Sequence, residues 1–258
     1  MKMKNFVLVV LLMSVFLVVF GTLFSDARNR NIAYEITWIG DGGSPSINNR
    51  REIVWIKKTD TLYQMVFSNL RGELVTVGHN RSPSINNAGV IIYVSRWSNT
   101  TSIWIYGQEE RVATTIVISP DINDRGEIVY TKHVNGYWQI FSNLRGQLTF
   151  DLVNHFSPSI NNRGELVWEQ QIRTYPQIFS NFRGQITFGN RRNERPSINN
   201  RGEIVWITSR EKIFSSVNRE LPISGVGHIM RVNINDRGDI AIGTLDHGVF
   251  LATLSRKK

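Results

Sequence analysis

The dipeptide Ile-Asn recurs six times along this chain of 258 residues, and its regular spacing constrains the fold more than any other feature. Successive copies are separated by 38, 37, 38, 38 and 36 residues. A fixed period of about 20–50 residues is typical of chains built from copies of one supersecondary unit. We therefore predict one repeat domain over residues 32–254, with units centred on Ile47, Ile85, Ile122, Ile160, Ile198 and Ile234.

Each unit has the pattern of four short strands. Residues 196–206 read Pro-Ser-Ile-Asn-Asn-Arg-Gly-Glu-Ile-Val-Trp, and residues 139–149 show the second half of the unit as Gln-Ile-Phe-Ser-Asn-Leu-Arg-Gly-Gln-Leu-Thr. β-Branched and aromatic residues fill the strands, whereas Asn, Arg and Gly fill connections that suit tight hairpins. Four strands in about 40 residues are typical of one β-propeller blade. The sequence thus predicts an all-β, six-bladed propeller.

The two ends of the repeat domain complement each other. The last unit supplies only three strands, which end near residue 252. Residues 73–78, which are predicted to be a fourth strand, lead into the second Pro-Ser-Ile-Asn segment. Residues 34–40 have a similar pattern and lead in the same way into the first such segment. We expect the N-terminal strand to pair into the last blade and close the ring, which removes exposed sheet edges.

The repeat resembles the blades of TolB-like, WD40-like (PD40) bacterial propellers, whose core runs Pro-x-x-Ser-Pro-Asp-Gly before a hydrophobic strand. This chain has Pro-Ser-Ile-Asn-Asn-Arg-Gly in the corresponding place, for example at residues 196–202. The resemblance covers residues 32–254 and implies a propeller fold, but it carries no partner residues over. TolB itself has a separate N-terminal α/β domain for which this sequence has no room, so a Tol-system role is not expected.

The N-terminal segment is predicted to direct export. Lys2 and Lys4 precede an apolar run over residues 6–24, an order typical of secretory signals. Residues 1–27 are predicted to be a signal peptide, cut after Ala27, or alternatively an uncleaved membrane-anchor helix, since the run is long enough to span a bilayer. Both alternatives place the domain outside the cytoplasm, as a periplasmic or secreted protein or one anchored to the inner membrane. Membrane contact is expected only through this segment.

Charge and composition narrow the function classes. The net charge is +9, but the flanks carry most of it, because residues 31–255 hold 23 basic and 20 acidic residues. This balance argues against nucleic-acid binding. Cysteine is absent, which excludes disulfides and thiolate sites. Zinc, phosphate-loop and dinucleotide motifs are also absent, so no cofactor or metal is expected.

Candidate ligand-binding residues lie in connections that depart from the repeat. The loops between blades and between second and third strands differ from copy to copy, whereas the other hairpins hold to one pattern. A specific ligand needs different groups from different blades. The predicted set is His79, Trp97, Tyr137, His155, Arg191, Arg192 and His228. The alternative is that the sequences of these loops vary because no function constrains them. Metal binding by His79, His155 and His228 is not favoured.

Arginines form a second repeated set in the hairpin turns. Arg50, Arg125, Arg163, Arg201 and Arg237 lie in the first hairpins, and Arg71, Arg145, Arg183 and Arg219 lie in the third. They would form a basic ring on one face. Carboxylates follow two residues later, as Glu127 follows Arg125, so we expect these charges to offset each other across each turn.

Two functional hypotheses follow from this pattern. The first is an exported, non-catalytic binding or scaffold propeller that recognises a protein or glycan partner in the cell envelope. The alternative is a propeller enzyme, a hydrolase or lyase acting on envelope polysaccharide. Propeller enzymes assemble their sites from single residues of different blades, so the absence of a catalytic motif leaves this alternative open.

Overall fold

The computed structural model describes residues 32–58, 63–108, 111–209, 211–246 and 248–255. The chain divides into two compact units, Met1–Ile32 and Ala33–Lys258, and every described strand belongs to the second. The predicted signal or anchor segment over residues 1–27 lies outside the described residues. The described part of the chain contains no helix long and apolar enough to cross a membrane.

The described residues form strands and no helix, as the repeat pattern predicted. Four sheets have four strands each. The first contains both ends of the domain and consists of β1 (Ala33–Gly40), β24 (Val249–Ser255), β23 (Ile240–Thr244) and β22 (Ile229–Ile234). The others are β10 (Val117–Ile122), β11 (Ile128–Val134), β12 (Tyr137–Ser142) and β13 (Gly146–Gln147); β14 (His155–Ile160), β15 (Leu166–Ile172), β16 (Tyr175–Ser180) and β17 (Gly184–Gln185); and β18 (Asn193–Ile198), β19 (Ile204–Thr208), β20 (Lys212–Ser215) and β21 (Arg219–Glu220).

The remaining eight strands are joined into one sheet. It consists of β2 (Gly43–Ile47), β3 (Ile53–Lys58), β4 (Gln64–Ser68), β5 (Gly72–Val75), β6 (His79–Ile85), β7 (Ile91–Trp97), β8 (Thr100–Ile105) and β9 (Arg111–Thr115). A single parallel pair, Gln64 with His79, links β4 to β6, whereas all other pairings are antiparallel. This sheet is therefore two antiparallel four-stranded units that touch at one point.

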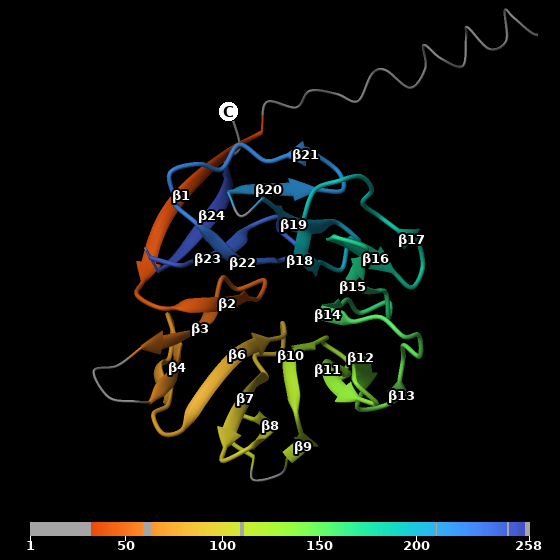
Figure 1. The fold of residues 1–258 in the computed structure, drawn as a ribbon. Helices are drawn as coiled ribbons and strands as arrows, with labels where there is room; N and C mark the ends of the chain where they lie inside the picture. Colours follow the sequence, from red (N-terminus) through yellow and green to blue (C-terminus); the bar gives the residue numbers. More distant parts are fainter. Residues whose placement is uncertain (1–31, 59–62, 109–110, 210, 247, 256–258) are drawn as a thin grey trace, which may run out of the picture. The chain divides into compact units, whose positions relative to one another are not determined.

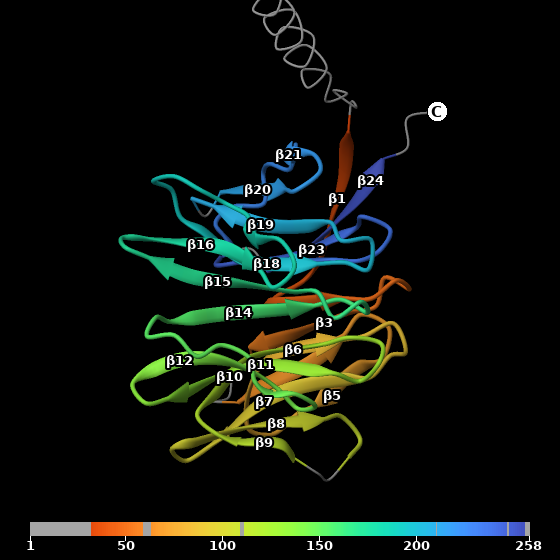
Figure 2. The ribbon, with the colours of Figure 1, turned by 90° about the vertical axis from the view of Figure 1, so that its right-hand side faces the viewer.

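The sheets surround a common centre, an arrangement consistent with a β-propeller. Figure 1 shows the first strand of each unit nearest the centre, from β2 through β6, β10, β14 and β18 to β22. β1 pairs with β24 over a register that begins at Ala33 opposite Ser255, and the two strands lie side by side in both views (Figures 1 and 2). The N-terminal strand is thus part of the same sheet as the last three strands.

Apolar side chains fill the space between neighbouring sheets. Trp206 of β19 is buried in one cluster with Ile198 and Ile204 of its own sheet and Val167 and Ile178 of the preceding one. Burial of such side chains away from water is the main force holding adjacent sheets together. The residue eight positions after the Ile of each pair is Trp or Tyr in five units and Ile242 in the last, and at Trp206 it serves packing between sheets.

The first Asn of each Ile-Asn pair stabilises the hairpin that follows it. Asn48 Oδ1 accepts hydrogen bonds from the backbone N–H groups of Arg50 and Glu52, both at 3.0 Å. Its Nδ2 donates to the carbonyl of Asn86 in the next unit at 3.4 Å. One side chain therefore fixes a turn and ties it to its neighbour, which explains why every copy carries Asn at this position.

Candidate functional site

Two faces are distinguished below. The turn face carries the first and third hairpins of each unit, and the loop face carries the connections between units and between second and third strands. The innermost strands run from the loop face to the turn face. The centre enclosed by these strands is called the channel.

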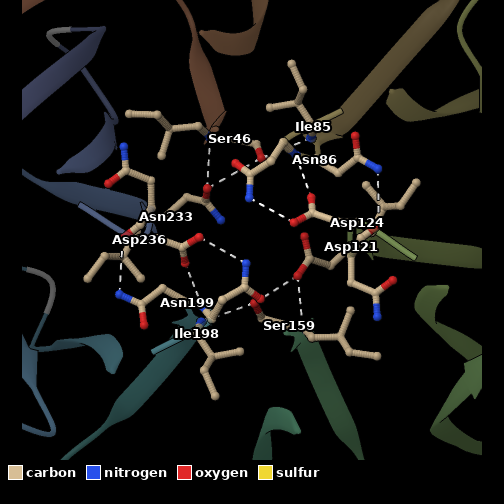
Figure 3. A pocket seen from close by; sticks show the side chains of 18 of the residues that line it. Ser46, Ile85, Asn86, Asp121, Asp124, Ser159, Ile198, Asn199, Asn233 and Asp236 are labelled. Carbon is tan, nitrogen blue, oxygen red and sulfur yellow. Dashed lines mark hydrogen bonds between the residues drawn. The ribbon is translucent and has the colours of Figure 1, made fainter. Parts of the chain in front are cut away.

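At its turn-face end, the channel is filled by a ring of side chains that follow the Ile-Asn pairs. Its members are Asn49, Asn87, Asp124, Asn162, Asn200 and Asp236 (Figure 3). Asp124 accepts hydrogen bonds from the backbone N–H and Nδ2 of Asn87, at 2.7 and 3.0 Å, and from Nδ2 of Asn162 at 2.6 Å. Although burial opposes ionisation, these donors hold the pKa of Asp124 below its ordinary value.

This ring closes the channel rather than opening a substrate site. The cavity it lines has a volume of about 60 Å³, which is enough for only a few water molecules. Each acidic member is matched by amide donors on both sides, as Asp236 is by Asn49 and Asn200 at 2.6 and 3.0 Å. The ring therefore closes this end of the channel and fixes how neighbouring units align with each other.

Asp121 lies one layer nearer the loop face, and its carboxylate is enclosed by hydroxyl and amide donors. Ser84 Oγ donates to Oδ1 at 2.7 Å, while Ser159 Oγ and the Ile160 N–H donate to Oδ2 at 2.8 and 2.9 Å (Figure 3). Burial raises the pKa of Asp121 against the effect of these donors and of Arg231. The residue is an ionisable group buried among hydrogen-bond donors.

Arg231 of β22 lies near this carboxylate and also interacts electrostatically with Arg195 of the adjacent innermost strand, β18. Burial lowers the pKa of Arg231, Asp121 opposes that shift and Arg195 adds to it. Guanidinium groups of this kind can bind an anionic group of a ligand.

Glu169 of β15 is a second carboxyl group with a shifted pKa, and it lies beside Arg195. Its Oε2 accepts a hydrogen bond from the backbone N–H of Arg195 at 3.2 Å, across the boundary between two sheets. Burial raises the pKa of Glu169 to about 6, and Glu194 adds to the shift, whereas Arg195 and Arg192 oppose it. A carboxyl group that titrates near neutral pH can take up or release a proton during a reaction.

Backbone geometry places Arg195 at an irregular point of its strand. The register of β18 shifts between Glu194 and Ser197, and Arg195 itself has a φ of 56°. Such left-handed, non-glycine residues are strained and cluster at functional sites. Ser82, Ser119 and Ser157 occupy the same position in other units with φ of 48–51°. The bulge is therefore a property of the repeat, and the arginine is what is special to this copy.

The four residues Asp121, Glu169, Arg195 and Arg231 are called the channel cluster from here on. Sequence analysis missed all of them, although all four depart from the repeat. Asp121 replaces the serine found in four other units, and Arg195 replaces the serine found before Pro in the first four. Glu169 occupies a position that is Ile or Val in three other units. Comparing copies position by position inside the strands, and not only in the loops, would have found them.

The predicted residues His79 and Trp97 lie near a separate cavity on the loop face. His79, Arg81, Arg96 and Ser98 line a cavity of about 280 Å³. Arg81 Nε is buried without a hydrogen-bond partner among the described residues. Trp97 lies between two of these lining residues in the sequence and is 82% exposed. This region carries positive charge and an exposed aromatic ring.

The other predicted residues are dispersed over the loop face. Tyr137 begins β12, and His155 begins β14, where it is buried and bonds to Asp151. His228 precedes β22 and is partly buried. Arg192 forms an ion pair with Glu194 at 2.9 Å, and Arg191 is exposed beside it. Only Arg192 contributes electrostatically to the channel cluster.

The turn carboxylates do not bind the arginines expected for them. Glu127 forms its ion pair with Arg145 of the third hairpin, at 2.6 Å, and not with Arg125 two residues before it. Glu52 and Glu165 pair in the same way with Arg71 and Arg183. These pairs join the first and third hairpins of one unit, which the sequence spacing alone did not indicate.

Among the described residues, no group of three or more histidine or acidic side chains is placed to hold a metal ion.

Comparison with known proteins places the fold but not the family. No known protein family and no curated protein matches the chain. The structure is similar to a gluconolactonase from Xanthomonas campestris, with a TM-score of 0.59 and 10% identity over 86% of this chain and 90% of that one. It is also similar to the β-propeller domain of the Trilobed protease from Pyrococcus furiosus, with a TM-score of 0.53 and 14% identity over 83% and 79%.

A third similar structure is virginiamycin B lyase from Staphylococcus aureus, with a TM-score of 0.53 and 10% identity over 87% of this chain and all of that one. At these identities the likeness establishes the β-propeller fold. The similar propellers are enzymes or parts of enzymes, and this finding contradicts the expectation of a non-catalytic binding or scaffold module.

Proposed function

We propose that this chain is an exported propeller enzyme, a hydrolase or lyase that acts on a polysaccharide of the cell envelope. The observation that carries the proposal is the buried Glu169, with a pKa of about 6, held against Arg195 beside the channel. A carboxyl group tuned in this way can serve as a general acid or base in chemistry on sugars near neutral pH. The proposed reaction site is the channel cluster, approached from the loop face.

In this proposal Glu169 acts as the general base. At pH 7 a carboxyl group of pKa about 6 is mostly ionised and still basic enough to take a proton. In a hydrolase the proton comes from the attacking water, and in a lyase it comes from the sugar carbon next to the carboxylate. In both cases it moves to a carboxylate oxygen of Glu169, and the leaving oxygen takes a proton from solvent.

Arg195 and Arg231 would bind the anionic part of the substrate. Guanidinium groups form paired hydrogen bonds with carboxylates and stabilise negative charge that develops during the reaction. Burial lowers the pKa of Arg231 and repulsion by Arg195 adds to this shift, so an anion bound beside both guanidinium groups would be favoured. An acidic polysaccharide, with a carboxylate on its sugar ring, therefore fits the cluster better than a neutral one.

The architecture behind this site is inferred to be a closed ring of six blades of the TolB-like, PD40 type. The eight-stranded sheet would count as two blades, and the pairing of β1 with β24 would complete the sixth. Hydrogen bonds between Asn233 and Ser46 and Ile47 link the last unit to the first and support this count. Export is inferred from the charge and hydrophobicity of residues 1–27.

The proposal is tested by incubating the purified chain with acidic and neutral polysaccharides and following two signals. Release of reducing ends reports cleavage, and ultraviolet absorbance of a new carbon–carbon double bond reports the lyase reaction only. We expect cleavage of at least one acidic polysaccharide, lost in Glu169→Gln and kept in Glu73→Gln, a variant of an exposed turn-face residue. Equal activity of both variants, or no cleavage of any acidic polysaccharide, would refute the assignment.

A further inference from the structure

The third hairpins present large apolar side chains to solvent. The residue at the tip is Leu70, Leu144, Phe182 or Val217, with exposed fractions of 63, 67, 62 and 67%. Single exposed apolar residues are common and need no explanation. Here one occurs at the same position in four units. A repeated exposed apolar side chain indicates a surface that meets an apolar environment.

The same face carries unpaired positive charge. Five exposed arginines in the first hairpins, Arg50, Arg125, Arg163, Arg201 and Arg237, form no ion pair with the described residues. Glu52 and Asp239 are engaged by Arg71 and by Arg51, the latter at 2.9 Å, whereas Glu73 and Glu203 form no ion pair with the described residues. The turn face therefore combines apolar tips with exposed guanidinium groups.

In the sheet of β22, β23, β24 and β1, both ends of the domain lie where the other units have their third hairpin. In that sheet Ala33 of β1 lies opposite Ser255 of β24, where the other units have a turn. Tyr34 interacts electrostatically with Glu203 and Asp239, two first-hairpin residues, which places the start of β1 on the turn face. In the sequence, the apolar run over residues 6–24 comes before this point and Arg256, Lys257 and Lys258 come after it.

We propose that the turn face lies against a lipid bilayer that contains anionic lipids. The apolar tips would enter the boundary between headgroups and acyl chains, and the arginines and basic C-terminus would contact lipid phosphates. Charge complementarity and the attachment point of the apolar N-terminal segment both favour a membrane over a protein partner. This arrangement would leave the loop face and the channel cluster open to substrate, but the inference does not depend on the proposed activity.

The test uses the full chain, and the absence of cysteine permits labelling at one chosen site. Phe182→Cys places a polarity-sensitive fluorophore in the turn that follows β16, on the turn face, and Tyr175→Cys places it at the first residue of β16, on the loop face. Leu144→Cys repeats the turn-face measurement in another sheet. Each labelled protein is incorporated into vesicles of phosphatidylcholine with or without phosphatidylglycerol, and a lipid-borne quencher reports contact with the bilayer.

We expect the labels at positions 182 and 144 to shift their emission to shorter wavelength and to be quenched in phosphatidylglycerol vesicles. The label at position 175 should show neither effect, and Arg163→Gln with Arg201→Gln should reduce the quenching at position 182 severalfold. Equal exposure of turn-face and loop-face labels to water in all vesicles would overturn the proposal. Protection at position 182 that appears only after envelope proteins are added would assign the face to a protein partner and would also overturn it.

Discussion

The backbone N–H of Arg195 donates a hydrogen bond to Oε2 of Glu169 across the boundary between two neighbouring sheets, at 3.2 Å. Glu169 comes from the second strand of its sheet, and Arg195 comes from the bulge of the next innermost strand. The bond fixes a carboxylate whose burial raises its pKa to about 6. This relationship joins the repeat architecture to the proposed chemistry, because the bulge is common to the units and the carboxylate is not.

The stability of the fold is expected to depend on pH through Glu169. Its pKa rises from 4.5 to about 6 on folding, so the folded state favours the protonated form. The resulting stability is fully present below pH 4.5 and is lost as the pH rises through 6, by about 2 kcal/mol. Glu169→Gln lacks this titrating group and so lacks the loss. In urea denaturation, the free energy of unfolding of the variant minus that of the natural chain should therefore increase by about 2 kcal/mol between pH 4.5 and pH 7. A difference that stays constant with pH would contradict the assigned environment.

Removing the Asp124 carboxylate should destabilise the centre of the channel. Asp124→Ala leaves three donors from Asn87 and Asn162 without their acceptor. We expect a loss of about 2–4 kcal/mol, since each unsatisfied donor in a partly buried site is costly. Arg125→Ala, at the next and exposed residue, is the matched control and should change stability by less than about 0.5 kcal/mol. Similar losses in both variants, measured by chemical denaturation, would show that the ring contributes no specific stability.

Deleting residues 31–40 should weaken the sheet that contains both ends. Tyr34 and Ile36 of β1 pack against the core of this sheet. Loss of their burial is worth about 3 kcal/mol or more, which corresponds to a fall in Tm of roughly 6–12 °C for a domain of this size. The exposed edge of β24 should also promote aggregation. Deleting residues 256–258 is the control, and equal melting curves for the two deletions would contradict the inferred closure.

Much of the fold could be predicted from the sequence because repeats make each local choice visible six times. The spacing of Ile-Asn, the hairpin residues after Asn48 and the packing role of Trp206 all follow from local chemistry and strand periodicity. The weak fourth strands were harder to bound, as β17 spans only Gly184–Gln185. Their pairing depends on the neighbouring strand more than on their own residues.

The candidate site was much less predictable. The predicted contacts were sought in variable loops, whereas the channel cluster lies on strands, where Asp121 and Arg195 interrupt an otherwise regular pattern. The pKa of Glu169 depends on burial by another sheet, a property that spacing along the chain does not reveal. Of the predicted loop residues, His79 lines a separate cavity together with Arg81, Arg96 and Ser98.

The most direct test of the proposed enzyme is the pH dependence of kcat/KM on the acidic polysaccharide that the natural chain cleaves. If Glu169 is the general base, kcat/KM should rise with an apparent pKa of about 6 and level off above it, because the base must be ionised. Glu169→Gln should lower kcat/KM by about 10²–10⁴-fold and abolish this rise. A Glu169→Gln enzyme that keeps the same profile and the same kcat/KM would contradict the account.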